Sequence, residues 1–150
     1  MSKFGNLSGA ADGTFRVRLI DRKTDQPVTN KAGEEAWIDV IYSNSAAGRT
    51  LDAEIARERA ALGKRDTQFE LNVMKLARMT KAWHLVDPIT CETINVRLSV
   101  DDAEEFYSLP LASDYFVQAW VACHAAENFM RDSSKNLSAL PSLRSATKEK

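Results

Sequence analysis

The segment from Pro110 to Asn136 constrains the fold of this chain more than any other. Its apolar residues recur at steps of three and four along two neighbouring stripes, which is the spacing of an α-helix that is apolar on more than one face. Such a helix is not stable alone in water, so the remaining residues must pack around it. We predict a helix from about Asp114 to Arg131, with an N-cap and a negative first turn supplied by Ser113 and Asp114. One stripe holds Tyr115, Ala119, Ala122, Ala126 and Phe129, and the other holds Phe116, Trp120, Cys123 and Met130.

The length and the charge balance narrow the classes of protein to which the chain can belong. Its 150 residues suit one domain, which buries roughly 70% of its unfolded surface. Lys and Arg total 20 against 21 Asp and Glu, which argues against a nucleic-acid-binding protein with its basic surplus. No apolar run approaches the ~20 residues that span a bilayer, and the first residues do not resemble a secretory signal. We therefore expect a cytoplasmic protein with neither a nucleic-acid nor a membrane partner.

Two stretches near the N-terminus show the pattern of half-buried strands. Apolar residues alternate with two arginines between residues 15 and 20, and residues 36–42 are rich in β-branched and aromatic side chains. Turn-forming residues fill positions 21–33 between them. We predict that the two strands pair as an antiparallel hairpin with a long connection, which needs a helix or a third strand against it.

Helical patterns follow in the middle of the chain. Residues 43–49 are predicted to form a loop, and Thr50 is a candidate N-cap for a first helix. Residues 67–70 form a capping box that begins a second helical stretch, which we expect to end near Ala82. Whether Gly63 separates two helices or weakens one long helix stays open, because a glycine costs only ~1 kcal/mol in a helix interior.

A further strand and a short helix are predicted before the apolar segment. The alternation of residues 94–98 indicates a short strand, and Asp101 with Glu104 forms an Asp-led capping box for a helix that ends near Leu109. The expected fold class is therefore α+β, with an N-terminal antiparallel β-hairpin followed by a mainly helical domain that holds one further short strand or hairpin. We expect a single domain over residues 14–131, a flexible N-terminal arm at 1–13 and a polar, disordered C-terminal tail at 132–150.

Residue chemistry alone indicates no enzyme. His84 and His124 are the only histidines, and we expect Cys123 and His124 to point to different sides of a helix, so we predict no metal site. Cys91 and Cys123 carry no catalytic signature and are expected to be reduced. Glycines are too scattered for a phosphate loop. We predict no catalytic residue and no cofactor, whereas an enzyme of an unrecognised type would show a concave site with converging polar groups.

Several segments, taken in order, resemble the tail assembly chaperones of long-tailed, siphovirus-like bacteriophages. TDQP and AWIDVIYSNSAAGR resemble the opening of that family, and KLARMTKAWHLVD resembles its approach to a tryptophan-containing turn. SVDDAEEFYSLPLASDYFVQAWVACHAAENFMRDSSKN resembles its closing part, in which an Asn-Phe pair, here residues 128–129, precedes a Ser-Lys-Asn stretch, here residues 134–136. The similarity covers most of residues 15–136.

The resemblance implies a non-enzymatic protein that binds the phage tape measure protein and keeps it soluble in the host cell cytoplasm during tail assembly. It implies that the chain is absent from the mature virion. In many members of the family a longer form made by frameshifting recruits the tail-tube protein. A structural virion protein of the tail or neck is the alternative, and the oligomeric state, including a homo-oligomer, is left open.

The apolar segment also supplies the candidate binding residues. One stripe of the predicted helix can pack within the domain while the other receives a partner helix, and aromatic and methionine side chains suit varied helical partners. The opposing interpretation is that the domain buries both stripes itself. The candidate partner-binding residues are Trp83, Tyr115, Phe116, Trp120, Phe129 and Met130.

Overall fold

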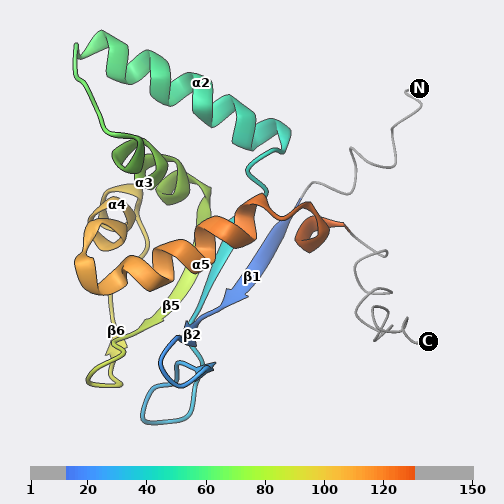
Figure 1. The fold of residues 1–150 in the computed structure, drawn as a ribbon, viewed down its shortest axis with the longest axis vertical. Coiled ribbons are helices and arrows are strands. Elements are labelled where there is room, and N and C mark those ends of the chain that lie inside the picture. Colours follow the sequence, from blue (N-terminus) through green and yellow to red (C-terminus); the bar gives the residue numbers. More distant parts are fainter. Residues whose placement is uncertain (1–12, 131–150) are drawn as a thin grey trace.

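The computed structural model describes residues 13–130, which form an α+β fold in which strands and helices alternate along the chain (Figure 1). The predicted α+β class is confirmed, but the prediction of an N-terminal hairpin followed by a helical domain is wrong in its order. The predicted arm at residues 1–13, apart from Gly13, and the predicted tail at 132–150 lie outside the described residues. The elements are β1 (Thr14–Arg18), β2 (Ile20–Asp21), β3 (Gln26–Pro27), β4 (Trp37–Ile41), α2 (Ala46–Ala61), α3 (Gln68–Met79), β5 (Thr80–Val86), β6 (Thr93–Ile94), α4 (Val100–Ser108), the 3₁₀ turn η1 (Pro110–Ala112), α5 (Ser113–His124) and the 3₁₀ turn η2 (Ala126–Phe129).

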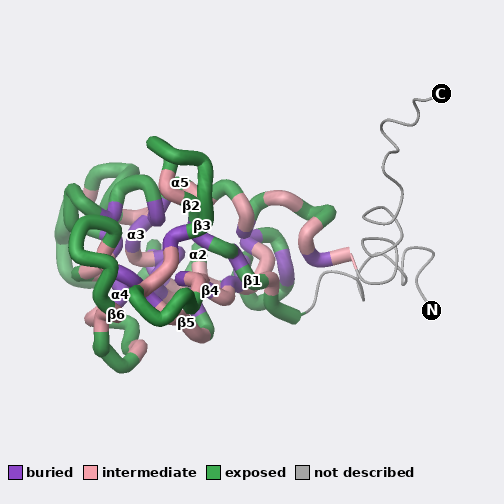
Figure 2. Tube along the Cα trace, turned by 90° about the horizontal axis from the view of Figure 1, so that it is seen from below, coloured by how far each residue is buried: buried purple, intermediate pink, exposed green. Residues whose placement is uncertain are grey.

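A four-stranded antiparallel sheet with the order β1-β4-β5-β6 organises the fold. The predicted hairpin is confirmed as the β1–β4 pair, in which Val17 lies opposite Ile38, and its long connection contains the small β2–β3 hairpin. Because side chains alternate across a strand, Val17 and Ile38 point into the core while Arg16 and Asp39 pair at 2.9 Å on the solvent side. Helices α3, α4 and α5 cover the apolar face (Figure 1), and buried positions gather inside the fold (Figure 2).

Strand β5 is the element that the sequence analysis missed. The predicted second helix runs on to Ala82, whereas α3 ends at Met79 and the chain continues directly into β5 from Thr80. Trp83 lies opposite Ile38 of β4, so pairing with a distant strand overrides the local helical pattern here. The strand predicted at residues 94–98 is also wrong in extent, since β6 keeps only Thr93–Ile94.

The first helix begins earlier than predicted because Ser45, not Thr50, is its N-cap. The Ser45 hydroxyl oxygen accepts a hydrogen bond from the Gly48 backbone N–H at 3.1 Å. Gly48 is required for close packing, since a Cβ atom at this position would lie 2.2 Å from the Ser43 carbonyl oxygen. Gly63 has a φ of +64° just after α2, so it separates two helices.

The caps of the later helices are partly as predicted. The capping box of Thr67 and Glu70 is confirmed at the start of α3. Helix α4 is capped instead by Ser99, whose hydroxyl oxygen accepts from the Asp102 backbone N–H at 3.1 Å, so the Asp101 capping box is wrong. Ser113 does not cap α5 either, because the helix follows directly from the turn η1 with no side-chain cap.

The apolar helix is shorter than predicted. Helix α5 ends at His124, and the chain passes through an extended residue, Ala125, into η2. This break carries the Phe129 ring to the rings of Phe15 and Tyr42, at centroid distances of 6.0 and 5.2 Å. The Ala122 carbonyl at the helix end accepts two hydrogen bonds, one from the Ala125 backbone N–H at 3.2 Å and one from the Asn128 side-chain amide at 3.0 Å.

Candidate functional site

The six predicted partner-binding residues divide into two groups. Tyr115, Phe116 and Phe129 are 4%, 7% and 5% exposed, so they belong to the core of the domain. The other three, Trp83, Trp120 and Met130, are half-buried. The structure brings Phe116 and Trp120 together in a stack and places Trp83 elsewhere, on β5. Both aromatic stripes thus face largely inward, and their role in partner binding stays a prediction.

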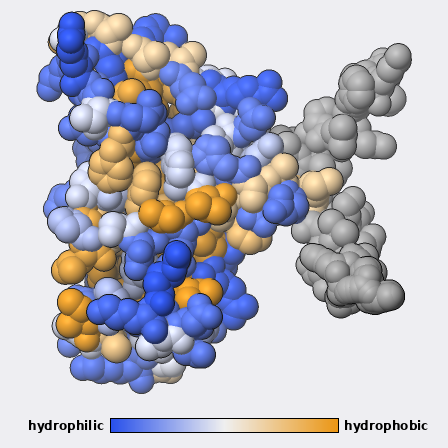
Figure 3. Space-filling model, in the orientation of Figure 1, coloured by the Kyte–Doolittle hydropathy of each residue, from blue (hydrophilic) through white to orange (hydrophobic). Residues whose placement is uncertain are grey.

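The outward side of α5 carries aliphatic residues that the sequence analysis did not select. Val117 and Val121 are 45% and 62% exposed and lie one helical turn apart. An apolar strip crosses the middle of the molecule over this helix (Figure 3). A count of spacings from Val117 would have found this third stripe, but the aromatic stripes beside it gave a stronger signal.

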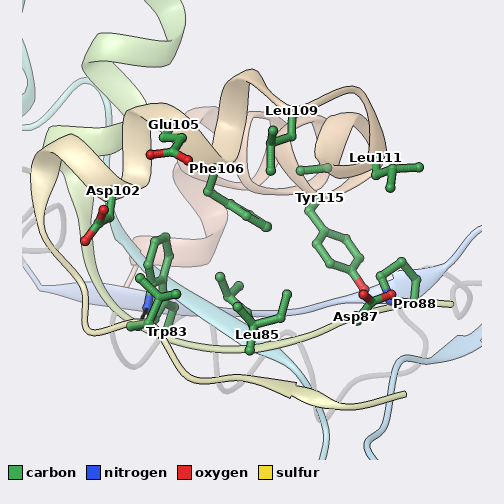
Figure 4. Close-up of a pocket in the computed structure, with 13 residues that line it drawn as sticks. Trp83, Leu85, Asp87, Pro88, Asp102, Glu105, Phe106, Leu109, Leu111 and Tyr115 are labelled. Carbon is green, nitrogen blue, oxygen red and sulfur yellow. Dashed lines mark hydrogen bonds between the residues drawn. The ribbon is translucent and has the colours of Figure 1, made fainter. Parts of the chain in front are cut away.

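A groove with a volume of about 230 Å³ lies between α4 and η1 on one side and β5 and β6 on the other (Figure 4). It unites Trp83 and Tyr115, two of the predicted residues, with aliphatic side chains from three other segments. Its lining residues are Trp83, Leu85, Asp87, Pro88, Ile94, Val96, Asp102, Glu105, Phe106, Leu109, Leu111, Ala112 and Tyr115.

The aromatic walls of the groove are held in place. The Trp83 indole N–H donates to the Val96 carbonyl at 3.0 Å, and its ring packs edge-on against Phe106 at 5.6 Å. Tyr115 donates its hydroxyl hydrogen bond to the Val86 carbonyl at 3.1 Å, and burial raises the pKa of this phenol to about 12. The groove is therefore a preformed cavity with rigid aromatic sides.

The rim of the groove is apolar and open to solvent. Val96, Leu109 and Leu111 are 43%, 47% and 74% exposed. Pro110 follows the C-cap residue Leu109 and cannot continue α4, so the two leucines project from the α4–η1 corner over the groove (Figure 4). Exposed aliphatic side chains beside a concave apolar surface are typical of a protein-binding site.

Of the residues that the structure describes, three carboxylates and no basic side chain line the groove. Asp87 stabilises the turn that follows it, since its Oδ1 atom accepts hydrogen bonds from the backbone N–H groups of Ile89 and Thr90 at 2.8 and 3.2 Å. Asp102 and Glu105 take part in no ion pair within residues 13–130. The groove thus combines an apolar floor with local negative charge.

A second hollow, between α2, α3 and α5, contains a buried lysine. The Lys75 ammonium group donates to Asp52 Oδ2 at 3.0 Å and to Ser43 Oγ at 2.8 Å. These partners satisfy the charge, so Lys75 links α2 to the body of the protein rather than offering a free cation.

The neighbouring pair Cys123 and His124 is closer than predicted, with 3.4 Å between Sγ and Nδ1. However, Nδ1 lies 2.7 Å from the Trp120 carbonyl oxygen, so this nitrogen must carry a proton and cannot accept one from the thiol. Burial also raises the pKa of the Cys123 thiol to about 12. The geometry does not form an activated nucleophile.

Across residues 13–130, no three His, Cys, Asp or Glu side chains gather as a metal-binding group. None of the described helices is long and apolar enough to cross a membrane. Comparisons of the chain with protein families, with curated proteins and with solved structures found no match.

Proposed function

We propose that this chain is a non-enzymatic tail assembly chaperone of a long-tailed bacteriophage. In this proposal it binds the tape measure protein in the host cell cytoplasm, keeps it soluble while the tail is built, and is absent from the mature virion. The resemblance over residues 15–136 suggests the partner. The observation that carries the proposal is the open apolar groove between α4 and β5.

The exposed residues at the groove suit a reversible interaction. Complete burial of a leucine or valine side chain stabilises a complex by ~1.5–3 kcal/mol. Val96, Leu109 and Leu111 are already partly covered, so each contributes less than that. Association itself costs on the order of 4–15 kcal/mol. One groove therefore binds one helical segment weakly, which allows release when tail-tube subunits replace the chaperone.

A long helical client also offers many segments to many copies of a small chaperone. A frameshifted form that recruits the tail-tube protein belongs to the same proposal because the resemblance implies it, and a homo-oligomer would place several grooves on one particle. Several weak sites acting together retain an aggregation-prone chain more firmly than one site does.

Co-expression with the tape measure protein tests the proposal. We expect the wild-type chain to move the tape measure protein into the soluble fraction, and Leu111→Glu to reduce this effect several-fold by placing a charge on the apolar rim. Because Leu111 is 74% exposed, the variant should keep the wild-type melting temperature. Val121→Glu is the matched control, since Val121 is 62% exposed and does not line the groove.

Solubility of the tape measure protein that is unchanged by the wild-type chain would contradict the chaperone function. Purified mature particles distinguish the alternative. A stoichiometric band of this chain in washed virions would favour a structural protein of the tail or neck, whereas its absence is expected for the chaperone.

A further inference from the structure

The groove has a chemical polarity along α4 that restricts what can bind in it. The residues of α4 and its C-cap that line it are Asp102, Glu105, Phe106 and Leu109, which recur at steps of three, one and three. Residues 102–109 span about two helical turns, or roughly 10 Å. The wall is therefore acidic at the N-terminal end of α4 and apolar at its C-terminal end.

Local helix energetics do not account for all of this charge. Asp101 and Asp102 lie in the first turn of α4, where negative charge interacts favourably with the helix dipole. Glu105 lies beyond the first turn and still borders the groove. Figure 4 shows the carboxylates of Asp102 and Glu105 at the same end as the Trp83 ring, with Leu111 and Pro88 at the other end.

These groups together make a suitable environment for a cation. A Lys or Arg side chain entering at this end would meet two carboxylates and an indole, which attracts cations through its ring face. Its aliphatic stem would lie on the apolar wall. Among residues 13–130, no basic side chain lines the groove to compete for this place.

We infer that the groove selects amphipathic helices in which a Lys or Arg lies one turn away from a pair of apolar anchor residues. The anchors pack between Leu85, Phe106 and Leu111, and the basic residue lies at Asp102 and Glu105. This inference rests on the proposed function for the identity of the partner, and it names the kind of segment within that partner that is bound.

Synthetic helical peptides test the inference. The basic probe is an alanine-rich 18-residue peptide with leucines at two positions four apart and two lysines one turn before them. The acidic probe replaces the lysines with glutamates, and isothermal titration calorimetry compares the two. We expect the basic probe to bind about tenfold more tightly at low salt, with the preference disappearing toward 1 M salt.

Two double variants separate the effect of charge in the groove from an effect on folding. Asp102→Asn/Glu105→Gln should bind both probes alike, whereas Asp101→Asn/Asp114→Asn removes the same charge from outside the groove and should keep the preference. Leu111→Glu should weaken both probes. Equal binding of both probes by the wild-type chain, no binding of the basic probe, or an unchanged preference in Asp102→Asn/Glu105→Gln would each overturn the inference.

Two further measurements test whether another segment or molecule fills the groove. A peptide of residues 131–150 that displaces the basic probe would assign the groove to the chain's own C-terminal residues. A dimer in sedimentation that Leu111→Glu dissociates would assign it to a second copy. Either result overturns the inference.

The chaperone function and the preference of the groove for basic helices can each be disproved without the other. If the wild-type chain prefers the basic probe but does not solubilise the tape measure protein, the proposed function fails alone. If it solubilises the tape measure protein but binds both probes alike, the charge selection fails alone.

Discussion

Helices α5 and α2 are attached to the same domain by different interactions. Of the 12 residues in α5, Tyr115, Phe116, Ala119 and Cys123 are buried. Helix α2 has 16 residues but buries only Gly48 and Ile55. Figure 1 shows the contrast, with α5 lying across the sheet and α2 at the edge of the molecule.

Ion pairs replace apolar contacts in α2. Its Asp52 and Glu58 pair with Lys75 and Arg78 of α3 at 3.0 and 2.7 Å. Ion pairs near the surface contribute little to stability, because solvent screens them and side-chain entropy opposes them. Helix α5 therefore holds the domain together through apolar contacts, whereas α2 is attached more weakly and has a lower local stability.

Removing the Phe116 ring should have the largest effect. Phe116 contacts the rings of Tyr107, Phe69 and Trp120, so Phe116→Ala leaves a cavity in the core. We expect the free energy of unfolding in urea to fall by about 3–5 kcal/mol. Val121→Ala, on the exposed side of the same helix, should change it by less than about 0.5 kcal/mol. Equal effects of the two substitutions would mean that α5 does not hold the core as described.

Gly48→Ala should have the next largest effect and should act through α2. The added methyl group would overlap the Ser43 carbonyl oxygen, so the first turn of the helix must shift. We expect a loss of about 1–3 kcal/mol in thermal or urea unfolding. Ala47→Ser, at the exposed neighbouring position, is the control and should be nearly neutral. A wild-type melting temperature for Gly48→Ala would show that the start of α2 adapts without cost.

Alkaline pH should weaken the packing of both α4 and α5, because burial raises the pKa of Tyr107 in α4 as well as those of two groups in α5. Burial raises the pKa of Tyr115 from 10.0 to about 12 and that of Cys123 from 9.0 to about 12. The unfolded chain loses these protons first, so their contribution to stability is complete below about pH 9 and is lost as the pH rises toward 12.

Urea midpoints measured from pH 8 upward check this prediction. The midpoint should fall above pH 9, and it should fall less steeply in Tyr115→Phe, which cannot ionise at that position. A midpoint that stays constant up to pH 11 would show that α5 does not shield these groups from solvent.

Breaking one ion pair should have the smallest effect and should be confined to α2. The hydrogen bond from Arg78 lowers the pKa of the Glu58 carboxyl, yet the pair lies at the surface. Glu58→Gln should speed hydrogen exchange of the α2 amides and leave those of α5 unchanged. Faster hydrogen exchange in both helices would mean that they unfold as one unit. Glu54→Gln is the control, because the Glu54 carboxylate has no ion pair within residues 13–130.

Local signals allowed part of the fold to be predicted. The β1 and β4 strands follow from period-two alternation, and the start of α3 follows from the capping box at Thr67, whereas only the structure shows that Gly63 separates two helices. Each signal involves residues within a few positions of one another. The prediction that α5 is apolar on two faces was equally local, and both faces proved to be needed inside the domain.

Of the 13 described residues that line the groove, two are among the predicted partner-binding residues. Trp83 and Tyr115 were chosen because they are aromatic, but the leucines at 109 and 111 carry no periodic signal in the sequence. Their position over Trp83 depends on how α4 and η1 pack on β5. No single segment of the sequence shows that these leucines lie close to Trp83.

The amino-acid sequence by itself determined the α+β class, the positions of the first two paired strands and the helix start at Thr67, because hydrogen bonding and burial between near neighbours suffice for these. Only the tertiary structure decided that residues 80–86 extend as a strand beside β4. The same is true of the end of α5 at His124, which lets Phe129 reach Phe15. It is also true of the groove, which apolar side chains from distant segments enclose. Contacts between residues far apart in the chain outweigh local preference at these places, since burial against a distant partner contributes more free energy than the local pattern does.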